Sequence, residues 1–108
     1  MPLVLPAPVA GYFDAANAAQ AAVASLHFAL DATVADEGRT HTGTAEIAAW
    51  IADVTEKYAC TATPTAVRED SGQTVVTASV AGNFPGSPIE LDYVFRVSGA
   101  RITNLEIA

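Results

Sequence analysis

The stretch "DATVADEGRTHTG", Asp31–Gly43, separates an alanine-rich half of the chain from a half rich in threonine and valine. Its first residues change to a period of two, and the β-branched Thr33 and Val34 favour an extended strand. We therefore expect the chain to pass from helix to strand at Asp31. Helical patterns come before this point and strand patterns dominate after the next helix, an order that is typical of an α+β fold.

Three segments have the spacing of helices, at residues 8–18, 20–28 and 43–59. In the first and third, apolar residues recur every three or four positions, so each segment should bury one stripe: Val9, Tyr12, Phe13 and Ala16, and then Ile47, Trp50, Ile51, Val54 and Tyr58. Thr44 is the expected N-cap of the third helix. In the short second segment, Val23, Leu26 and His27 should face inward.

Four strand-like segments follow, "CTATPTAVRE", "QTVVTASVAG", "SPIELDYVFRV" and "RITNLEIA", with Gly-, Pro- and Ser-containing turns between them. They predict antiparallel hairpins. In the second segment both sets of alternate residues are mostly apolar or small, whereas a sheet that covers one core usually has a polar outer face. We therefore predict a homodimer through the sheet face opposite the helices, with an apolar patch of Val76, Val80 and Val94.

Composition limits the classes of function. A chain of 108 residues suits a single domain, residues 1–108. The formal charge of -7 and five scattered basic residues argue against nucleic acid as a partner. No apolar run approaches the ~20 residues that span a bilayer, so we expect no membrane association and a cytoplasmic location. Cys60 is the only cysteine, and His27 and His41 show no ligand spacing, so we expect no metal and no cofactor.

Four charged or titratable residues, Asp36, Glu37, Arg39 and His41, lie within six positions of each other. Two interpretations of Asp36 remain open: a carboxylate in a pocket, or a strand-end group that binds turn amides or pairs with Arg39. Glu37 should point the opposite way, into solvent. His41 is either an acid or base at the pocket rim or a residue that caps the helix or lies exposed.

The segments "YFDAANA", "FALDATVADEGRTHTGTAEIAAWIADVTEKY" and "GNFPGSPIELDYVFRVSGARITNLEI" resemble small bacterial proteins of the nuclear transport factor 2-like superfamily. This group includes SnoaL-type polyketide cyclases and ketosteroid isomerase. The resemblance implies a cone-shaped α+β fold, in which a curved, mostly antiparallel sheet wraps around three helices and leaves an apolar cavity at the open end.

The resemblance also assigns site residues. Asp36 matches the proton-shuttling aspartate of ketosteroid isomerase, and Tyr12 matches its oxyanion-hole tyrosine. The third position of that site falls on Tyr93, while Asp92 should lie on the opposite face of the strand. Asp36, Tyr12, Tyr93 and His41 are thus the candidate catalytic residues. The expected wall of the cavity is formed by Phe13, Trp50, Val54, Tyr58 and Phe95.

Two functions of different classes follow from this pocket. As an enzyme, the protein would use Asp36 to remove a proton next to a carbonyl, while Tyr12 or Tyr93 donates to the oxyanion. As a binding module, it would hold a small apolar ligand with no bond change. In either case the expected partner is a small apolar or carbonyl-containing molecule.

Overall fold

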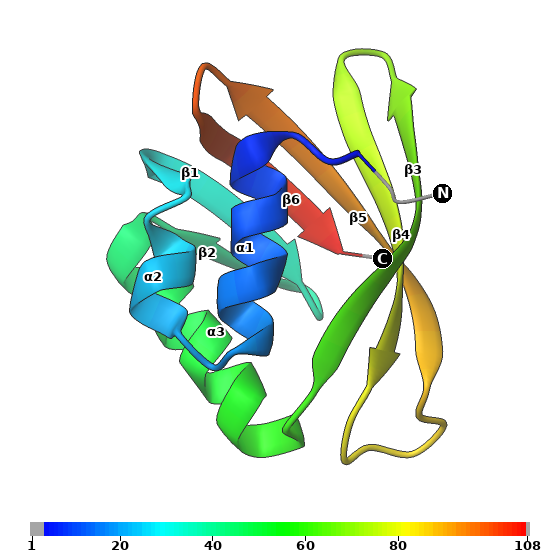
Figure 1. Ribbon diagram of the computed structural model, residues 1–108. Helices are drawn as coiled ribbons and strands as arrows, with labels where there is room; N and C mark the ends of the chain where they lie inside the picture. Colours follow the sequence, from blue (N-terminus) through cyan, green and yellow to red (C-terminus); the bar gives the residue numbers. More distant parts are fainter. Residues whose placement is uncertain (1–3, 108) are drawn as a thin grey trace.

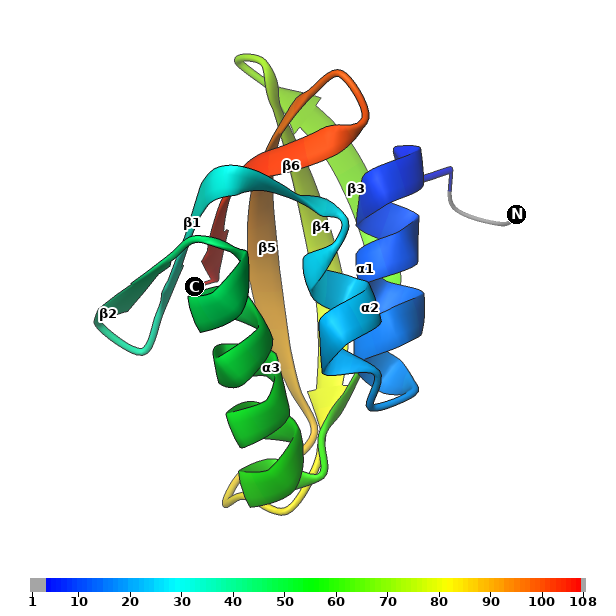
Figure 2. The same ribbon diagram turned by 90° about the vertical axis from the view of Figure 1, so that its left-hand side faces the viewer.

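The computed structural model describes residues 4–107, which form three helices and one six-stranded sheet. The helices are α1 (Ala7–Asn17), α2 (Ala21–Ser25) and α3 (Thr44–Tyr58). The strands are β1 (Phe28–Asp36), β2 (Arg39–Thr42), β3 (Thr61–Asp70), β4 (Gln73–Ala81), β5 (Ile89–Ser98) and β6 (Arg101–Ile107). All three helices lie on one side of the curved sheet (Figures 1 and 2).

The strand order is β2-β1-β6-β5-β4-β3. Every neighbouring pair is antiparallel except β1 and β6, which run parallel. Register shifts interrupt the β1–β6, β3–β4 and β5–β6 pairs, and such irregularities bend strands and increase their twist. The predicted α+β class and curved, mostly antiparallel sheet are confirmed.

The stripes predicted for the first and third helices carry much of the core. Val9, Tyr12 and Phe13 of α1 are buried, and so are Ile47, Trp50 and Ile51 of α3. The core continues on the sheet with Phe28, Val34, Phe95, Ile102 and Leu105, all of which are almost fully buried.

The second helix differs from its prediction. α2 has only five residues, because β1 begins at Phe28 rather than at Asp31. Val23 and Leu26 were expected to face inward but are 46% and 65% exposed, while His27 is half-buried. Ala24 and Ser25 are the buried residues of α2, so small side chains bring this short helix close to its neighbours.

The region just before α3 also differs from its prediction. Arg39–Thr42 forms strand β2, which pairs with the end of β1 and was not predicted. Gly43 is the N-cap of α3, not Thr44, and its φ of 87° is one that glycine adopts without strain. The Glu46 carboxylate accepts a hydrogen bond of 3.0 Å from the Thr42 amide, which ties the first turn of α3 to β2.

The predicted apolar patch on the outer face of the sheet is wrong for two of its three residues. Val76 and Val80 are 0% and 6% exposed and belong to the core that the helices cover. Val76 is the register partner of the buried Tyr93, so both side chains point to the covered face. Val94 alternates with Tyr93 along β5 and therefore lies on the outer face. There Asp92 accepts a hydrogen bond of 2.9 Å from the Thr77 hydroxyl. The outer face is thus substantially polar, and Asp92 lies opposite Tyr93 as predicted.

No helix within residues 4–107 is both long enough and apolar enough to cross a membrane.

Candidate small-molecule site

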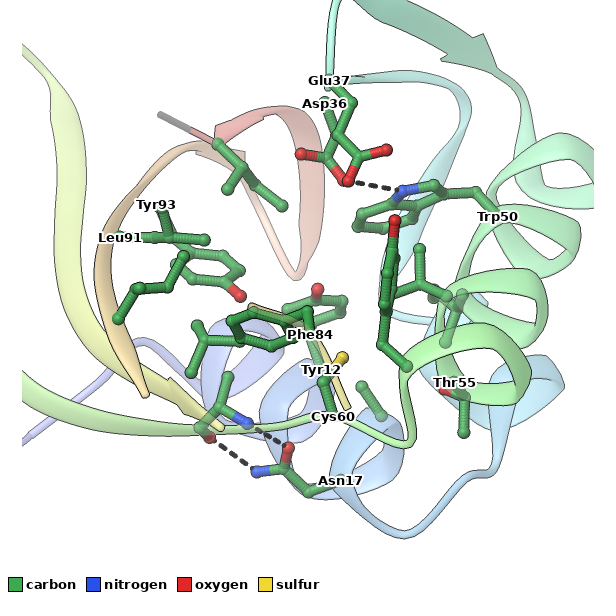
Figure 3. A pocket seen from close by; sticks show the side chains of 18 residues that line it. Tyr12, Asn17, Asp36, Glu37, Trp50, Thr55, Cys60, Phe84, Leu91 and Tyr93 are labelled. Carbon is green, nitrogen blue, oxygen red and sulfur yellow. Dashed lines mark hydrogen bonds between the residues drawn. The ribbon is translucent and has the colours of Figure 1, made fainter. Parts of the chain in front are cut away.

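A cavity of about 240 Å³ lies between the helices and the covered face of the sheet. Figure 3 shows Asp36 and Glu37 at one end and Asn17 at the other, with Tyr93 and Trp50 on opposite sides. Most of the wall is aromatic or aliphatic: Tyr12, Ala16, Trp50, Ile51, Val54, Tyr58, Ala62, Val80, Phe84, Ile89, Leu91, Tyr93 and Ile107. A compact, largely apolar molecule would fit such a space.

The turn between β1 and β2 positions the acidic end of the cavity. Asp36 is the last residue of β1, and Arg39 is its backbone register partner in β2. The two turn residues, Glu37 and Gly38, have φ values of 54° and 75°, as a two-residue hairpin of the I′ type requires. This turn leaves Glu37 exposed, as predicted, but its side chain borders the same cavity as Asp36 instead of pointing the opposite way.

Trp50 holds the Asp36 carboxylate in place. Its indole Nε1 donates a hydrogen bond of 3.1 Å to Asp36 Oδ2, from one wall of the cavity to its acidic end (Figure 3). Trp50 was predicted only as a wall residue. Its position on the buried stripe of α3 was readable from the sequence, whereas its donor role depends on how α3 is placed against β1.

Burial raises the pKa of the Asp36 carboxyl, and this is the largest effect on it. The hydrogen bond from Trp50 lowers the pKa, the negative charge of Glu37 raises it, and His41 and the Glu37 backbone lower it. The side chains that act on this pKa are Trp50, Glu37 and His41. Phe13 and Phe95, which were predicted as wall residues, are not among them.

Two tyrosines supply phenols to the same cavity. Tyr12 comes from α1 and Tyr93 from β5, and both side chains line the cavity that Asp36 lines. Burial raises the pKa of both phenols, and the nearby Asp36 charge raises the pKa of each one further. Because a raised pKa keeps a phenol protonated, both groups are hydrogen-bond donors at neutral pH.

His41 lies behind Trp50 and does not border the cavity. The two rings stack with centroids 5.9 Å apart and an interplanar angle of 29°. His41 instead borders a polar hollow of about 310 Å³ that adjoins the cavity and shares Asp36, Glu37 and Trp50 with it. Of the two interpretations left open for His41, a place on the rim of this cavity is not found, although its charge still acts on the pKa of Asp36.

Phe13 and Phe95 are also displaced from their predicted positions. Both are buried in the core, behind the cavity wall. Phe13 packs edge-on against Tyr12 and Tyr93, with centroids 5.1 Å away in each case, and Phe95 lies 5.9 Å from Tyr12. They support the two tyrosines. Trp50, Val54 and Tyr58 do lie on the cavity wall.

Sequence reasoning missed the end of the cavity where Asn17 lies. There the Asn17 side chain makes two hydrogen bonds of 2.8 Å with the backbone of Ala62, which fasten the end of α1 to β3 (Figure 3). Cys60 and Phe84 also line the cavity, and Phe84 contacts Tyr58 edge-on at 6.0 Å. Asn17 at a helix end and the "GNFPG" turn were visible in the sequence, but nothing there indicated that they meet.

The Phe84 loop docks closely on the end of α3. The Asn83 amide donates to the Tyr58 carbonyl at 2.6 Å, and the Gly82 amide donates to the Ser87 hydroxyl at 2.9 Å. A Cβ at Gly82 would lie 2.7 Å from the Tyr58 carbonyl oxygen and 2.8 Å from Cys60 Cβ. A glycine is therefore needed for this close approach.

The arrangement brings one carboxylate and two phenols to a single largely apolar space. Such a set can orient a ligand by hydrogen bonds, or it can pair a base with donors to a developing negative charge. Within residues 4–107, no three His, Cys, Asp or Glu side chains gather in a way that would hold a metal ion.

A curved sheet with three helices on one face and a partly open, largely apolar cavity defines the class of cone-shaped α+β pocket proteins. Among solved structures, a candidate polyketide cyclase from Sinorhizobium meliloti is 38% identical to this chain, with a TM-score of 0.91 and coverage of 96% of this chain and 95% of that protein. This chain belongs to the nuclear transport factor 2-like superfamily, among its SnoaL-like proteins.

More distant structures share the fold alone. A protein from Catenulispora acidiphila with a ketosteroid isomerase-like fold, in complex with trimethylamine, is 22% identical with a TM-score of 0.84, over 97% of this chain and 86% of that one. A nuclear transport factor 2-like protein from Cytophaga hutchinsonii is 14% identical with a TM-score of 0.78, over 100% and 93%. No protein-family model and no curated protein matches the chain.

Proposed function

We propose that this protein holds a small, mostly apolar carbonyl compound in its cavity and removes a proton from the carbon next to the carbonyl. The observation that supports the proposal is that Asp36, Tyr12 and Tyr93 all line the same cavity. A base and a donor that face the same substrate position are the minimum for enolisation.

Asp36 is the proposed base. Burial raises its pKa, and a base whose pKa is closer to the working pH accepts a proton more readily than an ordinary aspartate does. The hydrogen bond from Trp50 fixes Oδ2 and so limits the orientations of the carboxylate. The reaction would move the substrate's α-proton to this carboxylate and leave an enolate.

Tyr12 and Tyr93 are the proposed donors to the enolate oxygen. Both phenols remain protonated at neutral pH because burial raises their pKa values. The edge-on packing of Phe13 against both rings limits their movement, so the donors are positioned before the substrate binds. His41 acts at a distance, through its charge on Asp36.

The alternative is a binding module without chemistry. A cavity with an aromatic and aliphatic wall can select a ligand by shape, and Asp36 would then only orient it. The Catenulispora acidiphila protein, which has the same fold, forms a complex with trimethylamine, a compact molecule that consists mostly of methyl groups. Shape selection needs no particular distance between the carboxylate and the phenols.

The experiment that separates the two begins with a thermal-shift screen of hydrophobic carbonyl compounds, including polyketide-like and steroid-like rings. Each hit is then tested for deuterium exchange at its α-carbon. For an enzyme, Asp36→Asn should slow exchange by roughly 10²–10⁴-fold and leave affinity largely intact. For a binding module, hits should show no exchange, and Trp50→Ala should weaken binding more than Asp36→Asn does.

Asp14→Asn is the matched control, because Asp14 is exposed on α1 and lies outside the cavity. It should leave exchange and affinity unchanged. Exchange that proceeds equally fast in Asp36→Asn would remove Asp36 as the base.

A homodimer through the outer face of the sheet is proposed as the assembly. The corrected outer face carries polar pairs such as Thr77 with Asp92, so the interface would be substantially polar. Light scattering at several concentrations measures the mass. A constant mass of 11.1 kDa, that of a single chain, would contradict the homodimer.

A further inference from the structure

The charged groups that line the cavity are all negative. Asp36 and Glu37 border it, whereas no lysine, arginine or histidine among the described residues does. The nearest basic residues, Arg39, His41 and Lys57, border only the adjoining polar hollow. The cavity thus has negative charge at one end and no basic side chain among the described residues that line it.

The remaining wall is rich in aromatic rings. All three tyrosines and the single tryptophan of the chain line this cavity, together with Phe84. Aromatic faces attract organic cations, and quaternary ammonium groups are recognised by aromatic side chains that surround them. One of these rings, that of Tyr58, already contacts an ammonium group, because Lys57 Nζ, which borders the adjoining hollow, lies 5.1 Å from its centroid.

We infer that the ligand of this cavity carries a cationic nitrogen, as an alkylammonium group that the aromatic wall surrounds and the Asp36 carboxylate attracts. The inference rests on the proposed function, since it names the ligand class for the same cavity. It concerns the charge of the ligand and applies whether the ligand is transformed or only held.

The state of Asp36 supports a cation over a neutral ligand. Its carboxylate is partly removed from water, which raises its pKa, and its hydrogen bond from Trp50 offsets this only in part. A ligand cation would supply the missing positive charge and favour the ionised form. A neutral carbonyl compound would remove more water and supply no charge.

The test compares choline with 3,3-dimethylbutan-1-ol, which has the same shape but a carbon atom in place of the charged nitrogen. Calorimetric titration of the full chain should give choline at least about tenfold tighter binding, which corresponds to ~1.4 kcal/mol. Asp36→Asn keeps an acceptor for Trp50 but removes the charge, so it should reduce this preference substantially. Glu37→Gln, at the exposed border of the cavity, should reduce it less.

The pH dependence gives a second readout, because choline is charged at every pH. Its affinity should rise as pH increases through the pKa of Asp36, and by linkage choline should lower that pKa. Other groups near Asp36 also titrate or carry charge: Tyr12, Glu37, Arg39, His41, Asp53, Lys57, Cys60 and Tyr93. The rise should therefore persist in His41→Asn and disappear in Asp36→Asn.

The outcomes separate this inference from the function on which it rests. If carbonyl compounds bind in the screen and choline binds no more tightly than its neutral analogue, the inference of a cationic ligand is overturned. The proposed function would still stand. A choline preference that is unchanged in both Asp36→Asn and Glu37→Gln would also overturn it. Absence of binding by carbonyl compounds, choline and the alcohol alike would contradict both.

Discussion

Replacing Asp36 by asparagine should make the protein more stable at neutral pH. A carboxyl whose pKa is raised in the folded state holds more protons when folded than when unfolded, between the two pKa values. The free energy of unfolding therefore falls as pH rises through that window. Above the folded-state pKa, the whole of this loss of stability is present. Asparagine carries no charge and can still accept the hydrogen bond from Trp50.

The size of this effect follows from linkage and exposure. Each unit by which a folded-state pKa exceeds the unfolded value costs about 1.4 kcal/mol at higher pH. Asp36 is only partly buried, so solvent screens its charge and reduces the cost. We expect Asp36→Asn to raise the free energy of unfolding at pH 7 by no more than about 1 kcal/mol, the size usual for partly exposed charges. This corresponds to a rise in Tm of at most about 4–8 °C for a domain of this size.

Urea unfolding of both proteins from pH 3 to pH 8 measures this difference. The gain should shrink toward zero below pH ~4, where the carboxyl is protonated in both the folded and the unfolded state. Asp14→Asn provides the matched control, since Asp14 is exposed and its replacement should change stability by less than about 0.5 kcal/mol. A loss of stability in Asp36→Asn at pH 7, or a gain that does not depend on pH, would refute the desolvation of Asp36.

The remaining predictions concern the residues around Asp36 and the opposite end of the cavity. Trp50→Phe removes the N–H donor and should raise the pKa of Asp36 further, as an NMR titration of the carboxyl carbon would report. If the protein catalyses enolisation, Tyr12→Phe or Tyr93→Phe should slow deuterium exchange by roughly 10²-fold, with affinity changed much less; equal losses of rate and affinity would speak against an oxyanion donor. Gly82→Ala places a Cβ against the Tyr58 carbonyl and should cost about 1–3 kcal/mol in urea unfolding, and a neutral result would show that the Phe84 loop moves freely.

The sequence predicted the long elements well, because their patterns reflect burial on one side. The stripes of α1 and α3 and the alternation in β4 and β5 are repeated many times, and turn residues mark the hairpins between them. The same patterns predicted part of the cavity wall correctly, because Trp50, Val54 and Tyr58 lie one or two turns apart on α3 and all line the cavity. The resemblance added Tyr12, Tyr93 and Asp36, which no periodicity distinguishes from core residues or a turn.

The errors arose where local patterns are short or where the answer depends on long-range pairing. β2 has four residues and is formed by its pairing with β1, and that pairing turns His41 away from the cavity and onto Trp50. Periodicity identified Phe13 and Phe95 as inward-facing but could not separate the cavity wall from the core behind it. Both faces of β4 read as apolar in the sequence, and only its register with β5 shows which one the helices cover.

The protonation of Asp36 connects the two proposals for this cavity and distinguishes their ligands. A neutral ligand that fills the cavity expels water from the carboxylate and should raise its pKa further. A cationic ligand expels the same water but supplies a positive charge, and should lower the pKa. Titrating the Asp36 carboxyl by NMR with and without each bound compound therefore gives shifts of opposite sign. A shift of the same sign with choline and with its neutral analogue would mean that the ligand's charge does not reach Asp36, and the carboxylate would then be left to orient or deprotonate a neutral compound.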